Sequence, residues 1–331
     1  MANPHVVSGF LDINSGGTPF DDLALKVYGG QVLGAFNKAT TTSGRRLERT
    51  IQSGKSAQFP VFGRFGAATA TSSADIGPAQ LHKPTRGQEI VFNTINSNEH
   101  VISIDGLLIA PLFIDVLDEA KSHFDVRAPY AEQQGQVLAE ADDKRTLAAA
   151  ISACRTATAG TTYGDQTSPE IDANMGTDVN ILKAAIYGAA EQLDNFSVPA
   201  NDRYCWIPPS AFYLLLQDGE FIDRDFNDGG NGSRATATMR SAADFMIVKT
   251  NNLPRDNWSS ETQLSTRLQD DYRTDNLGVC AHASATGVVT LMGLQFESMY
   301  TMERQGTMLI AKYAKGYDYL RPEAAVSLDL A

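Results

Sequence analysis

The chain has 331 residues, of which 43% are hydrophobic and 20% charged, so it can build one large domain or two ordinary ones and is not wholly disordered. Its 27 Lys and Arg against 39 Asp and Glu give a net charge of −12, which excludes a generally basic nucleic-acid-binding protein. The charge is uneven, because residues 1–64 carry seven basic and four acidic side chains, a net of +3, and the other 267 residues therefore carry −15.

The N-terminal part predicts one helix followed by irregular chain. Residues 22–36 form a predicted helix that Gly29 and Gly30 should weaken. Beyond Thr40 helical periodicity is absent, and residues 58–62 and 90–92 have the composition of short strands. The segment between these strands predicts a long projecting loop, and loops of that length usually have a function or are disordered.

Two helices are predicted next. Apolar residues at three- and four-residue spacing indicate the first, namely Phe113, Val116, Leu117, Ala120 and Phe124. Pro129 suits the first turn of the second, which should extend over residues 130–154, about twice the average helix length. We expect the buried face of this long helix to comprise Val137, Leu138, Ala141, Ala148 and Ile151.

The second half predicts further helices and strands without a regular βαβ alternation. Thr177 and Asp178 are suited to cap a helix over residues 179–193, and a short helix carries Phe212 and Leu215. Strands are predicted at 203–207, 245–248, 294–300 and 326–330. Together these elements predict an α+β class.

The three cysteines predict free thiols. Cys154, Cys205 and Cys280 are odd in number, far apart and without a Cys-x-x-Cys pair, which is typical of a protein in a reducing compartment. Residues 1–10 lack the basic and apolar regions of a signal peptide, and the most apolar stretch, 107–116, is too short to span a bilayer. We therefore expect a protein made inside the cell, with no membrane association.

No catalytic or metal-binding motif is complete. The run 53–56 resembles the end of a phosphate-binding loop, but Arg49 stands where the motif needs glycine. The acidic run 223–229 has Asp228 where a calcium loop needs glycine, which favours a solvated loop over incidental cation binding. Cys280 and His282 share a strand face, so a Cys–His nucleophile is conceivable, but a buried thiol beside a partly exposed imidazole is the commoner arrangement. We predict no enzyme activity, no cofactor and no metal.

One basic cluster stands out in this acidic chain. It comprises Arg45, Arg46, Arg49, Lys55 and Arg64. Such a cluster is either a solvated flexible arm or an arm that docks on an acidic surface, most economically on another copy of the chain.

Seven short motifs, each weak alone, occur in one order along the chain. They are Leu25-Lys26-Val27-Tyr28-Gly29-Gly30, residues 53–60, Ile104-Asp105-Gly106-Leu107-Leu108, Phe124-Asp125-Val126-Arg127, Val198-Pro199-Ala200, Ile310-Ala311-Lys312-Tyr313-Ala314 and Leu320-Arg321-Pro322-Glu323-Ala324-Ala325. The series resembles the major capsid proteins of short-tailed phages of the T-seven type.

The resemblance implies an α+β, Hong Kong 97-like phage capsid fold. Its parts would be an N-terminal arm (1–55), an extended loop (56–103), a peripheral domain (104–174) with a spine helix at about 128–155, an axial domain (175–280) and the C-terminal part of the peripheral domain (281–331). The sequence departs most from the family between Leu214 and Asp275, and no motif for lysine–asparagine crosslinking is visible.

The resemblance also implies a structural role. The chain would assemble into hexamers and pentamers of an icosahedral shell around double-stranded phage DNA, held without sequence-specific binding, in a virion assembled in the bacterial cytoplasm. The implied partners are other copies of the chain, a scaffolding protein and a portal. A decoration protein is a further possible partner. An encapsulin-type nanocompartment shell, which would package a cargo enzyme, and a cytosolic enzyme are the alternatives.

We expect eight residues of the arm and loop to contact neighbouring subunits. They are Arg45, Arg46, Arg49, Lys55, Phe59, Phe62, Arg64 and Phe65. The aromatic side chains would anchor the base of the loop, and the basic side chains would bind carboxylates of an adjacent copy.

Overall fold

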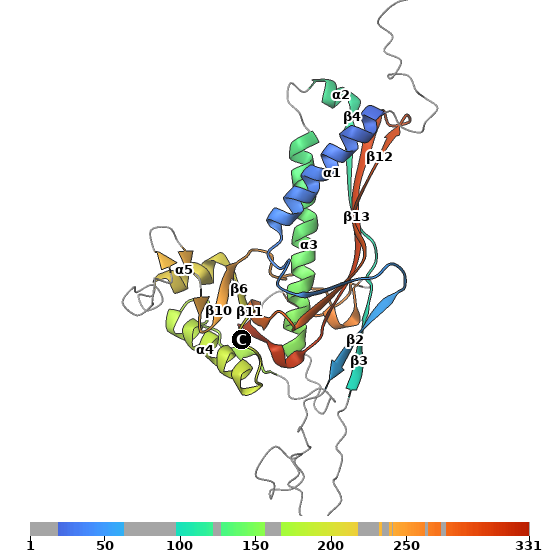
Figure 1. Cartoon of the computed structure of the whole chain (residues 1–331). Helices are drawn as coiled ribbons and strands as arrows, with labels where there is room; N and C mark the ends of the chain where they lie inside the picture. The colour runs from blue at the N-terminus through green and yellow to red at the C-terminus, as the bar shows by residue number, and fades with distance from the viewer. Residues whose placement is uncertain are drawn as a thin grey trace, which may run out of the picture.

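A computed structural model describes residues 19–62, 97–121, 127–155, 167–217, 241–261, 264–272 and 276–330, with two short strand pieces at 232–233 and 238–239. It combines one long helix with two main sheets, and each half of that helix packs against a different set of elements (Figure 1).

The long helix α3 (Arg127–Arg155) has 29 residues, so it extends roughly 43 Å. The prediction of a long helix here is confirmed, with three more residues at its start and one more at its end. Leu138, Ala148 and Ile151 are buried as expected, and Ala141 is half-buried. Val137 does not belong to the buried face, because it is 60% exposed and one residue, about 100°, away from Leu138 around the helix.

Around the upper half of α3 lie helix α1 (Pro19–Ala39) and a four-stranded sheet. The strand order is β1 (Leu47–Thr50), β12 (Thr286–Thr301), β13 (Gly306–Tyr319) and β4 (Leu108–Asp115). Strand β1 runs parallel to β12, and the other pairs are antiparallel. Val32 of α1, Leu138 of α3 and Leu309 of β13 meet in the core between these elements.

Two glycines allow α1 to pack closely. A Cβ atom at Gly135 of α3 would lie 2.5 Å from the carbonyl oxygen of Val32, and one at Gly29 of α1 would lie 2.9 Å from the ring of Phe296 on β12. Glycine in the interior of a helix normally weakens it. In the fold these two glycines are the points where α1 crosses α3 and contacts the sheet.

The predicted helix at residues 113–124 is wrong in its first part. Residues 108–115 form strand β4, and only Val116–Lys121 is helical (α2); Phe124 lies outside the described residues. Strand β4 pairs with β13 along its whole length, so its side chains alternate, with Ile114 buried toward α3 and Phe113 exposed on the other face. This two-residue period replaces the helical period that the spacing suggested.

The lower half of α3 packs against a six-stranded sheet. Its order is β5 (Glu170–Ile171), β14 (Ala325–Asp329), β11 (Asn276–His282), β6 (Arg203–Ile207), β10 (Phe245–Lys249) and β9 (Ser241–Ala242). From Thr146 to Cys154 every residue of α3 is buried, because core surrounds the helix there.

Helices α4 (Val179–Asn195) and α5 (Pro209–Gln217) belong to the same core. The carboxylate of Asp178 caps α4 by accepting a hydrogen bond from the backbone N–H of Asn180 at 2.8 Å. The predicted helices at 179–193 and around Phe212 are therefore confirmed, as are the predicted strands at 203–207, 245–248 and 326–330, with small changes of boundary. The strand predicted at 294–300 is also confirmed, but it is the second half of the longer β12, which begins at Thr286.

A two-stranded ribbon, β2 (Ser56–Phe62) with β3 (Ser97–Ser103), projects below the four-stranded sheet (Figure 1). Ala57 and Ile102 attach its base to a small core with Val289 and Leu320. The predicted strand at 58–62 is thus confirmed, and the one at 90–92 lies outside the described residues. The remaining elements are the short strands β7 (Gly232–Ser233) and β8 (Thr238–Met239) and two 3₁₀ turns, Thr266–Leu268 and Pro322–Ala324.

None of the helices in the described ranges combines the length and apolarity that a membrane crossing requires.

Candidate functional site

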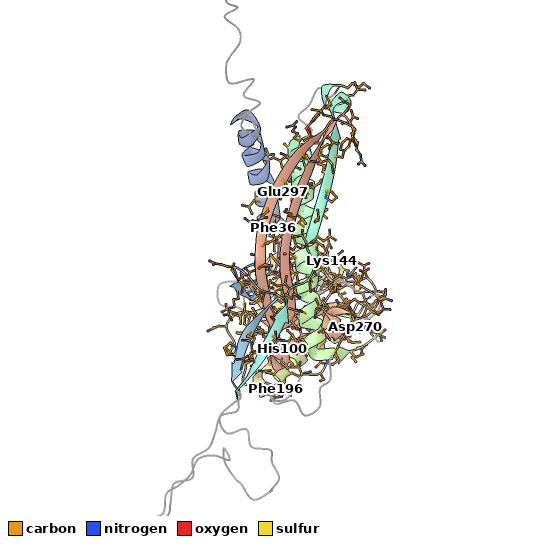
Figure 2. All side chains as sticks on the ribbon, turned by 90° about the vertical axis from the view of Figure 1, so that its right-hand side faces the viewer. Phe36, His100, Lys144, Phe196, Asp270 and Glu297 are labelled. Atoms are coloured by element: carbon orange, nitrogen blue, oxygen red, sulfur yellow. The ribbon has the colours of Figure 1, made fainter. Side chains whose placement is uncertain are left out.

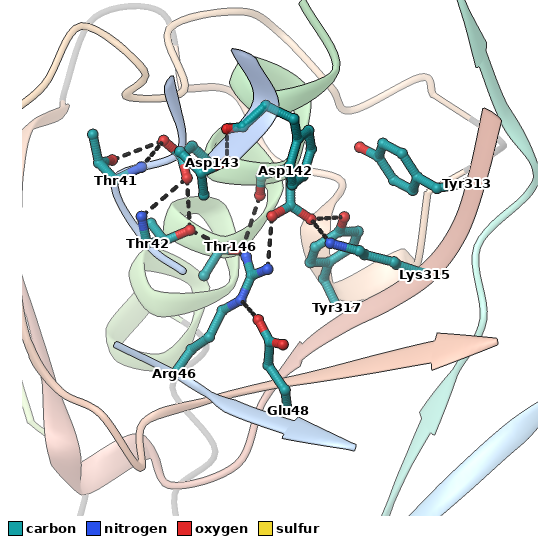
Figure 3. Close-up of polar contacts among 12 residues, drawn as sticks. Thr41, Thr42, Arg46, Glu48, Asp142, Asp143, Thr146, Tyr313, Lys315 and Tyr317 are labelled. Atoms are coloured by element: carbon teal, nitrogen blue, oxygen red, sulfur yellow. Dashed lines mark hydrogen bonds and ion pairs between the residues drawn. The ribbon is translucent and has the colours of Figure 1, made fainter. Parts of the chain in front are cut away.

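The basic segment after α1 is anchored inside its own chain. The side chain of Arg46 is only 2% exposed, and its Nη2 lies 2.7 Å from Oδ2 of Asp142 on α3 (Figure 3). Its Nη1 donates to the hydroxyl of Thr146 at 2.6 Å, and its Nε pairs with Glu48 at 2.7 Å. Arg46 therefore fastens the chain between α1 and β1 to the middle of α3.

Asp142 holds two cations at once. Besides Arg46, Lys315 Nζ lies 2.8 Å from Oδ1, and the hydroxyl of Tyr317 donates to the same oxygen at 2.5 Å. Burial by itself would raise the pKa of this carboxyl, but Arg46 and Lys315 hold that pKa below its ordinary value, so Asp142 stays ionised. With Glu48 included, two anions balance two cations in this cluster.

Asp143, the next residue, fixes the turn that follows α1. Its two carboxylate oxygens accept hydrogen bonds from the backbone N–H and hydroxyl groups of Thr41 and Thr42, at 2.6–3.1 Å. The side-chain amide of Asn252 donates to the same carboxylate at 2.9 Å. Through Asp143, the segment 40–44 is thus connected both to α3 and to the chain after β10.

The remaining basic residues of the cluster lie elsewhere. Arg45 donates to the carbonyl of Thr41 at 2.8 Å and stacks over the ring of Tyr204, 5.1 Å from its centroid. Arg49 is exposed and donates to the carbonyl of Gln58 at 2.5 Å, with its guanidinium 5.9 Å from the ring centroid of Phe59.

Lys55 is exposed, Phe59 is half-buried, the side chain of Phe62 is not described, and Arg64 and Phe65 lie outside the described residues. The structure therefore divides the basic cluster. Arg46 belongs to the interior of its own subunit, contrary to the expectation of one projecting arm, because Asp142 binds it there. Arg49 and Lys55 remain on the surface at the base of the ribbon.

The anions that anchor Arg46 and the threonines are the residues that sequence reasoning missed. Asp142 and Asp143 are adjacent charges inside the most apolar stripe of α3, next to Leu138 and Ala139. Charges at such positions are rarely buried unless they are paired. That position was the available signal, but the partners of Asp142 come from two distant parts of the chain, the segment before β1 and strand β13.

The face of the four-stranded sheet that points away from α3 carries a row of apolar side chains beside the Glu297–Lys312 ion pair. Register places Phe113 of β4, Met308 of β13 and Met299 of β12 side by side on the face away from α3. Phe113 is 42% and Met299 62% exposed. We call these three residues the outer row; Figure 2 shows the three long strands in front of α3.

The ribbon has an inner and an outer face. Strand β3 alternates, with His100 and Ile102 buried on the inner face and Val101, opposite Gln58, 48% exposed on the outer face. His100 Nε2 lies 3.4 Å from Oδ2 of Asp318, which attaches the inner face to β13. An isolated two-stranded hairpin is only marginally stable in water, so the part of the ribbon beyond this attachment would gain stability from a further contact.

The described residues contain no group of three or more His, Cys, Asp or Glu side chains arranged to hold a metal ion. Cys280 is buried, and His282 is half-buried with Nδ1 2.8 Å from the hydroxyl of Ser284. Burial lowers the pKa of His282. This is the arrangement of a buried thiol beside a partly exposed imidazole that the sequence favours.

Comparisons with known proteins agree with this fold. The family model "Gp10A-like: Major capsid protein" matches residues 78–329. The major capsid protein of Escherichia phage T7 is 31% identical over 328 residues, covering 92% of this chain and 90% of the relative. The capsid structure of the cyanophage P-SCSP1u matches with a TM-score of 0.75 and 34% identity over 99% of both chains. The mature capsid of bacteriophage PhiM1 shares the fold, with a TM-score of 0.67 at 17% identity over 88% of this chain and 87% of that one. The chain therefore belongs to the family of Gp10A-like major capsid proteins.

Proposed function

We propose that this major capsid protein builds the icosahedral shell of a short-tailed phage by assembling into hexamers and pentamers around double-stranded DNA. The observation that carries the proposal is the outer row of the sheet. Its apolar side chains Phe113 and Met299 are exposed in the single chain, and contiguous apolar surface on a folded protein marks contact with other proteins. A neighbouring copy would cover this row.

The proposed parts follow the Hong Kong 97-like pattern. The peripheral part would contain α3 and the four-stranded sheet, and the axial part would contain the six-stranded sheet with α4 and α5. Strands β11 and β14 pair in that second sheet. We therefore assign residues 276–282 and 325–329 to the axial part, although 281–331 was expected to complete the peripheral one.

The ribbon and the chain between its strands would form the extended loop. We propose that the loop lies across a neighbouring subunit, with Phe59 at its base and with Arg49 and Lys55 beside carboxylates of that neighbour. Arg45, Phe62, Arg64 and Phe65 complete the proposed interface, whereas Arg46 acts by holding the segment in place.

Further partners and location follow from the same proposal. Shell assembly would use a scaffolding protein and a portal in the bacterial cytoplasm, and the finished protein would be part of the virion. The net charge of −12 supports a lining that repels DNA, so the genome would be enclosed without sequence-specific binding.

Deleting residues 67–85 tests the proposed loop. The deletion leaves both ribbon strands intact, so we expect soluble, folded protein that does not close shells. Circular dichroism would measure the fold, and negative-stain electron microscopy would measure shells against loose subunits. Normal shells from the deletion variant would refute the role of the loop.

Replacing Arg49 and Lys55 by Gln tests the electrostatic part. Exposed ion pairs are each worth only about 0–1 kcal/mol, but they act together across many copies. We expect a lower shell yield than wild type at low salt, and similar yields near 1 M salt, where the Debye length falls to about 3 Å. Superimposed yield curves at all salt concentrations would show that these cations are merely solvated.

The particle contents separate the phage shell from the encapsulin alternative. Particles from productive infection should contain double-stranded DNA, whereas an encapsulin would contain a cargo enzyme. Family membership supports the phage shell.

A further inference from the structure

Two of the three cysteines lie directly opposite each other on neighbouring strands. Cys205 is on β6 and Cys280 is on β11, and the antiparallel register pairs them, although 75 residues separate them in the chain. Both strands are in the middle of the six-stranded sheet, with β14 on one side and β10 on the other. Local sequence does not indicate this pairing, since the spacing of the cysteines matches no short motif.

The hydrogen-bond ladder shows which kind of pair this is. The N–H of Ala283 donates to the carbonyl of Asp202 at 3.1 Å, so these two residues begin the ladder as a hydrogen-bonded pair. Hydrogen-bonded and non-hydrogen-bonded pairs alternate along an antiparallel ladder. Counting along the unbroken register makes Cys205 and Cys280 a non-hydrogen-bonded pair, the type with closer side chains and a Cα separation of about 4.5 Å.

This geometry matches the requirements of a disulfide. Disulfides need Cα atoms about 4.4–6.8 Å apart with Cβ vectors directed at each other. The two sulfur atoms lie 3.0 Å apart, and both side chains are fully buried in the main core. Little movement of the backbone is therefore needed to close the bond.

We propose that Cys205 and Cys280 are a latent disulfide, which closes across β6 and β11 when the protein meets a small disulfide oxidant such as glutathione disulfide. In the first step one cysteine thiolate attacks the oxidant, forms a mixed disulfide and releases one glutathione thiolate. The second cysteine then attacks the mixed disulfide and releases the other glutathione. In total two protein thiols are oxidised, one glutathione disulfide is reduced to two glutathione molecules, and the two thiol protons pass to the departing thiolates.

The position of the pair makes the reaction slow and selective. Burial raises the pKa of the Cys280 thiol, so the attacking thiolate is scarce, and the oxidant can enter only when the strand pair opens locally. Once closed, the bond would join the two ends of the segment 205–280. That segment contains α5 and β10.

Cys154 provides the internal control. It lies on α3 rather than on the strand pair, and its thiol donates to the carbonyl of Ile151 and accepts from the N–H of Ser327, both at 3.1 Å. Burial raises the pKa of this thiol to about 11. The register that sets Cys205 against Cys280 involves only the two strands, so Cys154 should remain reduced while that pair closes.

The test is a thiol count on the folded full-length protein after incubation with glutathione disulfide below its unfolding temperature. Remaining thiols are alkylated in denaturant, and the unreduced digest is analysed by mass spectrometry. We expect one free thiol in the wild type and none in Cys154→Ser, with a linked peptide pair containing Cys205 and Cys280 in both, and no intramolecular linked pair in Cys280→Ala, where Cys205 can form at most a glutathione adduct. The thermal midpoint of the oxidised wild type should rise by about 5–10 °C, because a long loop is closed in the unfolded chain, and that of Cys280→Ala should not change.

Three outcomes would overturn the proposal. They are three free thiols in the wild type after the incubation, a linked pair that contains Cys154, and a glutathione adduct that persists on Cys205 or Cys280 of the wild type. None of these readouts depends on shell assembly, so the result stands apart from the proposed function.

Discussion

Arg46 and Arg49 show how differently two arginines of one basic cluster can act. Arg46 is buried against Asp142, whereas Arg49 is exposed near the ribbon. Replacing one partner of a buried ion pair leaves the other charge uncompensated, which typically costs 3–5 kcal/mol, whereas an exposed pair is worth at most about 1 kcal/mol. Lys315 also pairs with Asp142 and offsets part of that cost.

We therefore expect Arg46→Met to lower the free energy of unfolding by about 3 kcal/mol and Arg49→Met, its matched control, by less than about 0.5 kcal/mol. Urea unfolding followed by circular dichroism measures both. Equal decreases for the two variants would show that the cluster around Asp142 does not anchor the segment.

Asp105 is a buried residue near the base of the ribbon, and nearby positive charge compensates only part of the cost of burying its carboxylate. Burial raises its pKa to about 6, although Arg145, with Nη1 3.6 Å from Oδ2, and a backbone hydrogen bond from Ser265 lower it. In the unfolded chain the carboxyl has its ordinary pKa near 3.8. Between these two pH values the folded state binds a proton that the unfolded state does not bind. Stability from this group is therefore present at pH 3.8 and below and is lost as the pH rises through 6.

Asp105→Asn removes that pH-dependent cost. We expect the variant to be more stable than the wild type by about 2–3 kcal/mol at about pH 7.5, with the difference vanishing toward about pH 4. Chemical unfolding at a series of pH values measures the difference. A difference that stays constant over this range would mean that Asp105 titrates at its ordinary pKa in the folded protein.

At the level of elements, the crossing of α1 over α3 depends on one missing side chain. Alanine is a better helix former than glycine by about 1 kcal/mol, so Gly→Ala in a helix normally stabilises it. At Gly135 the new Cβ would lie 2.5 Å from the carbonyl oxygen of Val32, and overpacking of this kind costs about 1–3 kcal/mol. By contrast, a Cβ atom added at Gly34, on α1, would have no other atom within 4 Å.

Gly135→Ala should therefore lower the thermal midpoint, while Gly34→Ala should leave it unchanged or raise it slightly. Differential scanning calorimetry of the two variants beside the wild type gives the comparison. If both substitutions were stabilising, α1 would not pack on α3 as described.

The elements differ in how far the sequence predicts them. Long periodic segments, such as α3 and α4, and strands of β-branched and aromatic residues, such as β6, are determined by local pattern and are predicted well. The spacing of Phe113, Val116 and Leu117 fits a helical period, but residues 108–115 pair with β13, nearly 200 residues later in the chain, and this pairing makes them a strand. The same limit applies to Asp142 and Arg46. Their charges predict that each would pair if buried, but the sequence does not show which residue is the partner.

On the scale of the whole molecule, α3 joins two cores of different character. Its lower half is enclosed by the six-stranded sheet and its helices, whereas its upper half is covered by α1 and one face of the four-stranded sheet. Arg155, at the end of α3, pairs with Asp329 of the last strand at 2.8 Å, which fixes the helix to the C-terminal part of the chain. The protein is therefore thinner around the upper half of α3, and the sheet there carries the outer row on its exposed face.

Residues on opposite faces of that sheet allow its role in folding to be tested separately from its role in assembly. Met299 belongs to the outer row, whereas Leu309, on the adjacent strand β13, is 5% exposed and belongs to the core beside α3. Leu309→Ser should lower the free energy of unfolding by about 2–4 kcal/mol, because it removes a buried apolar side chain and buries a hydroxyl. Met299→Ser removes an apolar side chain that the single chain leaves in water, so we expect a change within about 0.5 kcal/mol.

The order of the two variants should reverse when assembly is measured. In a shell the outer row would be covered by a neighbouring copy, so Met299→Ser should lower the shell yield, because every repeated interface would bury less apolar area, while its purified subunit unfolds like the wild type. Sedimentation through a sucrose gradient gives the shell fraction, and urea unfolding of the dissociated subunit gives its stability. A Met299→Ser protein that forms shells at the wild-type yield and salt tolerance would show that the contact between neighbouring copies does not depend on the outer row.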